Sequence, residues 1–196
     1  VNNLSETNWL SMYGGGVGIG FGIRSADEKS TGMMPHLKMY DASSLAYRQG
    51  KTRRGSYAAY LDIDHPDILL FLEMRKPTGD QNFRCLNLHH GINITDEFMN
   101  AVKKDKNVQL RWPVDSKSPD ISTKVSAQEL WHEIIESAHA TAEPGLLFWD
   151  TAKKMTPSDV YSDAGFASSS TNPCGEIILS PHDSCRLMLV NLTGFI

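Results

Sequence analysis

The residues best placed to do chemistry together lie near the C-terminal end, in the run Asn172-Pro173-Cys174-Gly175-Glu176. An amide, a thiol and a carboxyl occupy alternate positions, and in an extended chain such side chains point to the same side. Pro173 lacks a backbone donor and Gly175 weakens a strand interior, so an ordinary ladder strand is disfavoured here. We therefore predict a locally extended loop in which a hydrogen-bonding group, a sulfur and an acid/base face one space.

A second thiol follows this run. Ten residues separate Cys174 from Cys185, and the polar stretch 168–171 leads into the first thiol. A lone cysteine in a turn is often inert, because reactivity requires a particular microenvironment. A thiol–disulfide redox protein that uses both cysteines is one alternative, although the spacing lacks the C-x-x-C pattern of that class.

The composition sets limits on the kind of protein. The chain has 196 residues, 40% hydrophobic and 21% charged, with a formal net charge of −4. We expect a single domain over 1–196, without the basic field of a nucleic-acid-binding protein. No apolar run approaches the roughly 20 residues of a membrane span, and no secretory signal opens the chain. Three cysteines are too few for a disulfide framework, so we expect a reducing, cytoplasmic environment.

Apolar runs typical of strands alternate with helical patterns along the chain. Strands are predicted at 17–23, 56–63, 85–94, 108–112 and 145–149. This alternation predicts an α/β fold with mainly parallel strands. The pattern does not distinguish an open sheet from a closed barrel.

The helices are predicted from their ends and their apolar faces. An N-terminal helix has Leu4, Trp9 and Leu10 on its apolar face and ends at the glycines that begin with Gly14. A capping box at 126–129 predicts a helix over 127–140.

Four connecting segments are predicted from their polar composition. The stretch 115–124 is an exposed loop, 153–170 is a polar linker, and 51–55 is a basic turn that could meet an anion. The loop 76–84 (KPTGDQNFR) combines cations, amides and flexible backbone, which suits the recognition of a nucleotide base.

Glycine alternates with apolar residues over 14–22 (GGGVGIGFG). A dinucleotide-binding loop is disfavoured, because that fingerprint should follow a strand and open a helix. The alternation instead indicates a strand whose glycines let a ligand or another backbone approach closely. A tight barrel strand without a further role is the alternative.

The remaining cysteine and a pair of adjacent histidines are not predicted to do chemistry. Cys85 is interpreted as a structural residue of its strand. His89 and His90 are adjacent, and neighbours on a strand point to opposite faces, which makes them a poor chelating pair. No metal site is predicted.

The cysteine run, its polar lead-in and the second thiol before Asn191-Leu192 resemble the active-site loop of the ribonucleotide reductase large (catalytic) subunit. The resemblance, of a phage-like or bacterial type, covers nearly the whole chain. It implies the family fold, a ten-stranded α/β barrel with a cysteine loop through its centre. This chain then corresponds to the first half of the barrel plus that loop.

The resemblance also implies roles for individual residues. Cys174 would carry a thiyl radical and abstract the 3′-hydrogen of a ribose, and Glu176 would take the 3′-hydroxyl proton. Asn172 would hydrogen-bond the ribose hydroxyls, and Cys185 would be one of two reducing thiols. The backbone at 15–16, that is Gly15 and Gly16, would lie against the substrate.

Effector residues follow from the same resemblance. Arg24 would begin the first effector loop. The specificity loop, which links a bound dNTP or ATP effector to the choice of substrate base, would include Arg75, Lys76, Gln81 and Arg84.

The implied partners lie outside this segment, and we expect it to bind no cofactor directly. The radical would come from a separate metal-containing small subunit or, alternatively, from adenosylcobalamin, and thioredoxin or glutaredoxin would supply reductant. The other reducing cysteine, an acid for the effector sugar and the substrate-phosphate loop have no counterpart here. We therefore expect the isolated chain to be inactive, as a split-gene product or a truncated chain. A nucleotide-binding regulatory remnant without catalysis is a further alternative.

Overall fold

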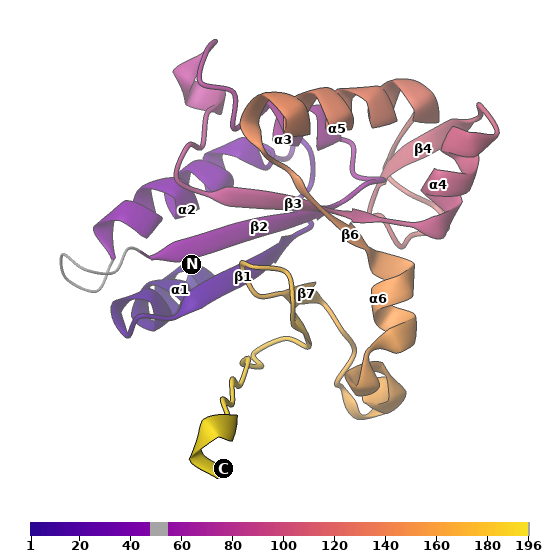
Figure 1. The fold of residues 1–196 in the computed structure, drawn as a ribbon. Helices are drawn as coiled ribbons and strands as arrows, with labels where there is room; N and C mark the ends of the chain where they lie inside the picture. Colours follow the sequence, from indigo (N-terminus) through magenta and orange to yellow (C-terminus); the bar gives the residue numbers. More distant parts are fainter. Residues whose placement is uncertain (48–54, 196) are drawn as a thin grey trace.

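The computed structural model describes residues 1–47 and 55–195 (Figure 1). In chain order the elements are α1 (Asn2–Met12), β1 (Gly16–Phe21), α2 (Met34–Ala46), β2 (Ser56–Asp62), α3 (Ile68–Glu73), η1 (Gln81–Phe83), β3 (His89–Ile94), α4 (Asp96–Lys103), β4 (Asn107–Trp112), β5 (Ile121–Ser126), α5 (Ala127–Thr141), β6 (Gly145–Phe148), α6 (Trp149–Met155), η2 (Pro157–Ala164), β7 (Ser170–Thr171), β8 (Ile178–Leu179) and η3 (Leu192–Phe195).

Four strands form one parallel sheet in the order β1-β2-β3-β6. Figure 1 shows α2, α3 and α5 on one side of this sheet, and the segment that contains β7 on the other. The predicted α/β fold with parallel strands is confirmed. The sheet is open, with β1 and β6 at its two edges.

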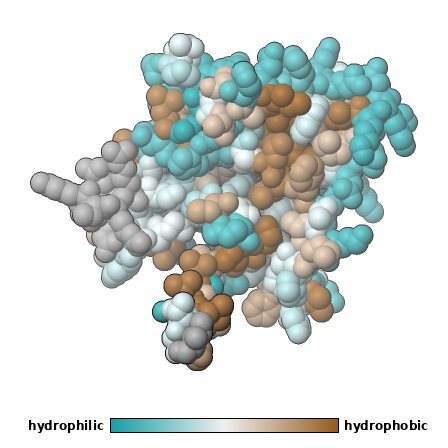
Figure 2. All heavy atoms as spheres, in the orientation of Figure 1, coloured by the Kyte–Doolittle hydropathy of each residue, from teal (hydrophilic) through white to brown (hydrophobic). Residues whose placement is uncertain are grey.

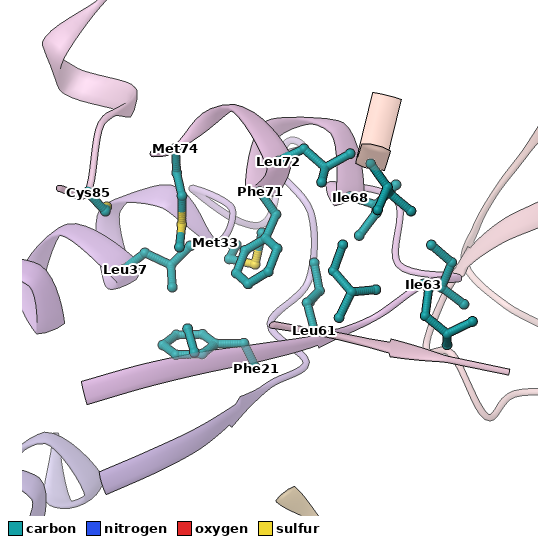
Figure 3. Close-up of a cluster of buried hydrophobic side chains, with 14 of the residues drawn as sticks. Phe21, Met33, Leu37, Leu61, Ile63, Ile68, Phe71, Leu72, Met74 and Cys85 are labelled. Atoms are coloured by element: carbon teal, nitrogen blue, oxygen red, sulfur yellow. The ribbon is translucent and has the colours of Figure 1, made fainter. Parts of the chain in front are cut away.

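The two faces of the sheet have different surroundings. Successive side chains of a strand point to opposite faces. On β2, Ala59 and Leu61 belong to the hydrophobic core beneath the helices, whereas Tyr60 and Asp62 line a cavity on the opposite side. Figure 3 shows Leu61 within the core cluster, below Phe71 of α3. One strand therefore supports both the core and the candidate site.

One predicted strand belongs to a different sheet. The expected strand 108–112 corresponds to β4, which pairs antiparallel with β5 and not with the four-stranded sheet. The expected exposed loop 115–124 is wrong in its second half, because β5 begins at Ile121. Residues 113–120 connect the two strands, and the β-branched residues Ile121, Thr123 and Val125 favour a strand in β5.

Two other local predictions are wrong. The expected polar linker 153–170 contains the end of α6 and all of η2. The expected apolar face of the N-terminal helix packs against the core only at Leu4, since Trp9 is 57% and Leu10 53% exposed. α1 instead buries Thr7 and Ser11, and polar contacts hold it in place: the Ser11 hydroxyl donates to the Tyr47 carbonyl, and the Tyr40 hydroxyl of α2 donates to the Asn3 side chain.

The predicted helix caps are present. The Ser126 hydroxyl accepts a hydrogen bond from the Glu129 amide at 3.3 Å, and the predicted helix over 127–140 is α5. The predicted strand at 85–94 is shorter and begins at His89. Residues 51–54 of the expected basic turn lie outside the described residues.

Two further features concern the environment of the chain. In the part of the chain that the structure describes, no helix has the length and apolar character needed to cross a membrane. All three cysteines are free: Cys85 is buried, whereas Cys174 and Cys185 are exposed.

Candidate active site

The cysteine run forms the turn of a short hairpin. β7 and β8 pair antiparallel, with Thr171 opposite Ile178. The Gly175 amide donates to the Asn172 carbonyl at 3.0 Å, and Gly175 has a φ of +83°. The expected extended chain is therefore wrong at this point, because a left-handed glycine reverses the chain direction. Cys174 lies at the tip of the turn, next to Pro173.

Asn172 holds this hairpin together with its side chain. The residue is buried, and its amide oxygen accepts hydrogen bonds from the Ile177 amide and from the Thr171 hydroxyl, both at 3.1 Å. An Asn side chain that bonds nearby backbone is a common means of fixing a turn. Asn172 therefore stabilises the loop that presents Cys174.

The glycines of β1 make room for the hairpin. A Cβ atom on Gly18 would lie 1.6 Å from the Thr171 carbonyl oxygen, which is an impossible contact. A Cβ atom on Gly16 would lie 3.1 Å from the Pro173 ring. The expectation that these glycines allow another backbone to approach is confirmed, and the approaching backbone is that of the cysteine hairpin.

A cavity of about 690 Å³ lies between β1, the hairpin and the segment that follows β8. Of the residues expected to touch substrate or to reduce it, four line this cavity: Gly15, Gly16, Asn172 and Cys185. Cys174 and Glu176 are exposed at the turn and are not among its lining residues. The structure thus gathers part of the predicted set around one cavity and leaves the thiol–carboxylate pair at its margin.

Two polar side chains in the cavity wall were not anticipated from the sequence. Asp62 ends β2 and Asn93 lies near the end of β3, and both line the cavity. The Asn93 amide nitrogen donates to the Asp62 carboxylate at 2.9 Å. The signal in the sequence was a polar residue within each apolar strand, on the face opposite the core.

The segment after the hairpin carries Cys185 and many exposed apolar side chains. Leu187, Met188 and Leu189 are each more than 80% exposed. Figure 2 shows brown apolar atoms gathered on this C-terminal segment at the foot of the view.

The residues expected to bind an effector lie at opposite ends of the parallel strands. Arg24 follows the carboxyl end of β1, where it bonds Asp27 and Asp120 and lies 5.0 Å from the Trp112 ring centroid. The loop 76–84 precedes β3 and therefore lies at the amino ends of the strands. The structure does not bring Arg24 together with that loop.

The loop 76–84 is held from within by its own cations and by α2. The Arg84 guanidinium donates to the Thr78 carbonyl at 2.6 Å, and Arg84 is buried. Lys38 of α2 donates to the carbonyls of Gln81 and Arg84. The side chain of Gln81 is exposed.

A partly buried charge cluster at the amino ends of the strands was also missed from the sequence. Glu143 lies within hydrogen-bond distance of His89 Nδ1 at 2.6 Å and of His90 Nδ1 at 2.7 Å, and 3.3 Å from Arg75 Nε. Burial opposes ionisation of Glu143, but these hydrogen bonds and the Arg75 charge outweigh it and bring the pKa of Glu143 to about 2. The adjacent histidines meet one carboxylate although one is exposed and the other buried.

Lys76 and Arg75 differ in their partners. Lys76 lies 3.6 Å from the exposed carboxylate of Glu73, a weak surface contact, whereas Arg75 contacts Glu143.

Across the described residues, no three His, Cys, Asp or Glu side chains are grouped where they could hold a metal ion. Cys85 is fully buried, and burial raises the pKa of its thiol to about 12, in keeping with the predicted structural role.

Comparison with known proteins identifies the family. The model of the ribonucleotide reductase barrel domain matches residues 1–196. The chain is 50% identical over 89% of its length to the ribonucleoside-diphosphate reductase large subunit of Invertebrate iridescent virus 6, and 48% identical over its full length to the putative large subunit of Frog virus 3. It is 31% identical over 98% of its length to the vitamin B12-dependent ribonucleoside-diphosphate reductase of Thermoplasma acidophilum.

The chain spans 18%, 35% and 25% of the length of these three relatives, respectively. The match supports neither a regulatory remnant nor a thiol–disulfide protein as an alternative. With the parallel sheet and the glycine strand beneath the cysteine hairpin, it shows that the chain belongs to the ribonucleotide reductase family, within its catalytic barrel domain.

Proposed function

We propose that this chain forms part of the catalytic barrel of an enzyme that reduces ribonucleotides to deoxyribonucleotides for DNA synthesis. The observation that supports this most directly is the hairpin turn. It places Cys174 and Glu176 close in the chain to Asn172, which lines a cavity together with Gly15 and Gly16. Such a cavity can hold a sugar against backbone while side chains act on its hydroxyls.

In the proposed reaction, a thiyl radical at Cys174 takes the hydrogen atom from C3′ of the ribose. The bond from C3′ to hydrogen breaks and an S–H bond forms, which leaves the unpaired electron on C3′. Glu176 accepts the proton of the 3′-hydroxyl as the general base. One of two thiols gives a proton to the 2′-hydroxyl, which leaves C2′ as water. The two thiols then supply two electrons and the hydrogen that replaces the hydroxyl, and become a disulfide. Glu176 returns its proton to the 3′-oxygen, and Cys174 returns the hydrogen atom to C3′, which restores the thiyl radical.

Cys185 is proposed as one of the two reducing thiols. It lines the same cavity as the residues that would hold the sugar, and its thiol is free. The second thiol belongs to the part of the catalytic subunit outside this chain. Thioredoxin or glutaredoxin would reduce the resulting disulfide after each turnover.

The radical source is proposed to lie outside this chain. Its chemistry is to remove the hydrogen atom from Cys174. The exposure of Cys174 at the turn fits a source that approaches from another subunit or from a bound cobalamin.

The effector residues are proposed to divide between recognition and support. Gln81 and Lys76 have side chains that a dNTP or ATP could reach, whereas Arg84 and Arg75 are engaged by Thr78 and Glu143 and shape the loop. Arg24, at the carboxyl end of β1, is proposed to orient the first effector loop through its ion pairs with Asp27 and Asp120.

The rest of the catalytic subunit is proposed to cover the C-terminal segment. Exposed apolar side chains in a row, such as Leu187 to Leu189, are typical of a surface that another part of the structure buries. The free thiols fit a reducing, cytoplasmic environment.

The test of this function is the Cys174→Ala variant of the complete enzyme, assembled with the remaining catalytic sequence and its radical source. We expect deoxyribonucleotide formation to fall to background while nucleotide binding, measured by calorimetry, is retained. Cys85→Ala is the matched control, because Cys85 is buried away from the cavity. Substantial turnover by Cys174→Ala would exclude the proposed radical cysteine.

A further inference from the structure

Tyr60 projects from the middle of β2 toward the cysteine hairpin, and the family match assigns it no role. It is 5% exposed and lines the same cavity as Asn172 and Cys185. Its neighbours on β2 that belong to the hydrophobic core, Ala59 and Leu61, point to the opposite face. A buried phenol needs a hydrogen-bond partner, and here the partner identifies its use.

The Tyr60 hydroxyl donates to the Asn172 carbonyl at 2.8 Å and lies 3.3 Å from the Pro173 carbonyl. The Asn172 carbonyl also accepts the Gly175 amide, which is the hydrogen bond that closes the turn. The phenol therefore binds the turn at its closing carbonyl and at the peptide oxygen directly before Cys174. Tyr60, 112 positions from Asn172 in the sequence, therefore fixes the backbone next to Cys174.

Glycines on both neighbouring strands accommodate the Tyr60 ring. A Cβ atom on Gly91 of β3 would lie 2.6 Å from one edge of the ring, and a Cβ atom on Gly18 of β1 would lie 3.3 Å from the other. The ring therefore lies between Gly91 and Gly18, neither of which has a side chain to occupy the same space. This packing sets the position of the hydroxyl, so that the hydrogen bond to the hairpin has a defined direction.

We propose that Tyr60 is a positioning residue for Cys174, a role that rests on the proposed radical function of this cysteine. By holding the Asn172 and Pro173 carbonyls, the phenol keeps the turn in the one arrangement that presents the thiol beside the cavity. Amide carbonyls accept the hydrogen bond but do not take the proton, so the phenol remains a neutral donor.

The electrostatics agree with this donor role. Burial, together with the negative charges that Cys174, Glu176 and Glu143 can carry, raises the pKa of Tyr60 to about 12. The phenol therefore keeps its proton at neutral pH, and the hydrogen bonds to the turn persist across the working range of the enzyme.

The first test is hydrogen exchange of the Gly175 amide in the full chain with Tyr60→Phe, which keeps the ring and removes the hydroxyl. We expect exchange to be roughly three- to tenfold faster, as for the loss of one hydrogen bond. Tyr57→Phe is the matched control, since Tyr57 is a buried tyrosine on the same strand whose hydroxyl faces α1. Equal exchange rates in the two variants would overturn the proposal.

A second measurement does not depend on exchange. In a Cys185→Ser background, Cys174 is the remaining exposed thiol, because Cys85 is buried. We expect Tyr60→Phe to change the rate of Cys174 alkylation by N-ethylmaleimide about threefold or more, because the turn samples other arrangements. An unchanged rate would count against the proposal even if the variant were less stable.

The third measurement separates positioning from general structure. In the complete enzyme, Tyr60→Phe should lower kcat roughly tenfold with KM unchanged, because thiol placement affects the chemical step and not binding. A change in KM alone would contradict the proposal. If Cys174→Ala remained active, the proposed function would fail while the exchange and alkylation results would still decide whether Tyr60 positions the turn.

Discussion

The two faces of the four-stranded sheet come from the same strands but are built from different side chains. The face under α2, α3 and α5 carries Leu61 and Ile92, which are fully buried and belong to the same core cluster as Phe71 of α3. Figure 3 shows Leu61 and Phe71 in this cluster. The opposite face carries Gly18, Tyr60 and other small or polar residues beneath the cysteine hairpin. The difference indicates that one face supplies stability and the other leaves space for a loop that does chemistry.

The physical reason lies in how each face is covered. Helices cover a sheet through interdigitated side chains, so bulky apolar residues are favoured there. A hairpin whose backbone lies directly on a strand requires the strand beneath it to lack side chains, as Gly18 does under Thr171. Substitutions on the two faces should therefore have different kinds of consequence.

The largest effect is expected on the helix-covered face. Phe71→Ala removes a fully buried ring and should lower the free energy of unfolding by about 3–5 kcal/mol, measured by urea denaturation. Leu70→Ala on the same helix is the control, because Leu70 is 41% exposed and should cost far less. Similar losses for both variants would contradict the assignment of this face as the core.

The next largest effect is expected from the charge of Glu143 at the amino ends of the strands. Glu143 has a pKa of about 2, below its ordinary value of 4.5, so its contribution is complete above pH 4.5 and is lost as the pH falls toward 2. We expect up to about 3 kcal/mol of stability to disappear across this window. Thermal unfolding of the wild type and of Glu143→Gln as a function of pH would measure it. A wild-type profile parallel to that of the variant would show that the contacts of Glu143 do not contribute this stability.

A smaller effect on stability, but a local one, is expected on the hairpin-covered face. Gly18→Ala should displace the hairpin, because the new Cβ atom would overlap the Thr171 carbonyl. The free energy of unfolding should fall by about 1–3 kcal/mol. Exchange of the Gly175 amide should rise more than exchange in the core strands. Gly20→Ala is the matched control, since its Cβ atom would meet Ser169 at an ordinary 3.5 Å. If both alanines were tolerated equally, close backbone contact would not explain the glycines.

The smallest effect belongs to neither face. Ser126→Ala removes the cap of α5 and should cost about 1 kcal/mol, seen as a modest fall in Tm. Thr123→Ala, an exposed position on β5, serves as the control. A loss as large as that of Phe71→Ala would mean that the cap has a tertiary role as well.

Local patterns in the sequence were enough for the fold class and for several elements. The alternation of strands and helices and the capping box at 126–129 both act between residues close in the chain. Their signals are short-range, so they survive in the isolated sequence. The chemistry-bearing residue types of the cysteine run were also evident, although their arrangement was not.

Tertiary structure decided how those residues meet. The turn at 172–175 depends on Gly175 adopting a left-handed φ, and an alternating pattern read as extended chain does not reveal this. Contacts of Glu143 with His89 and His90, and of Tyr60 with Asn172, join residues more than 50 positions apart. The sequence by itself determined which groups are available and which segments form elements. Only packing of distant segments decided which face holds the site, because the side-chain preferences of one strand do not specify what will cover it.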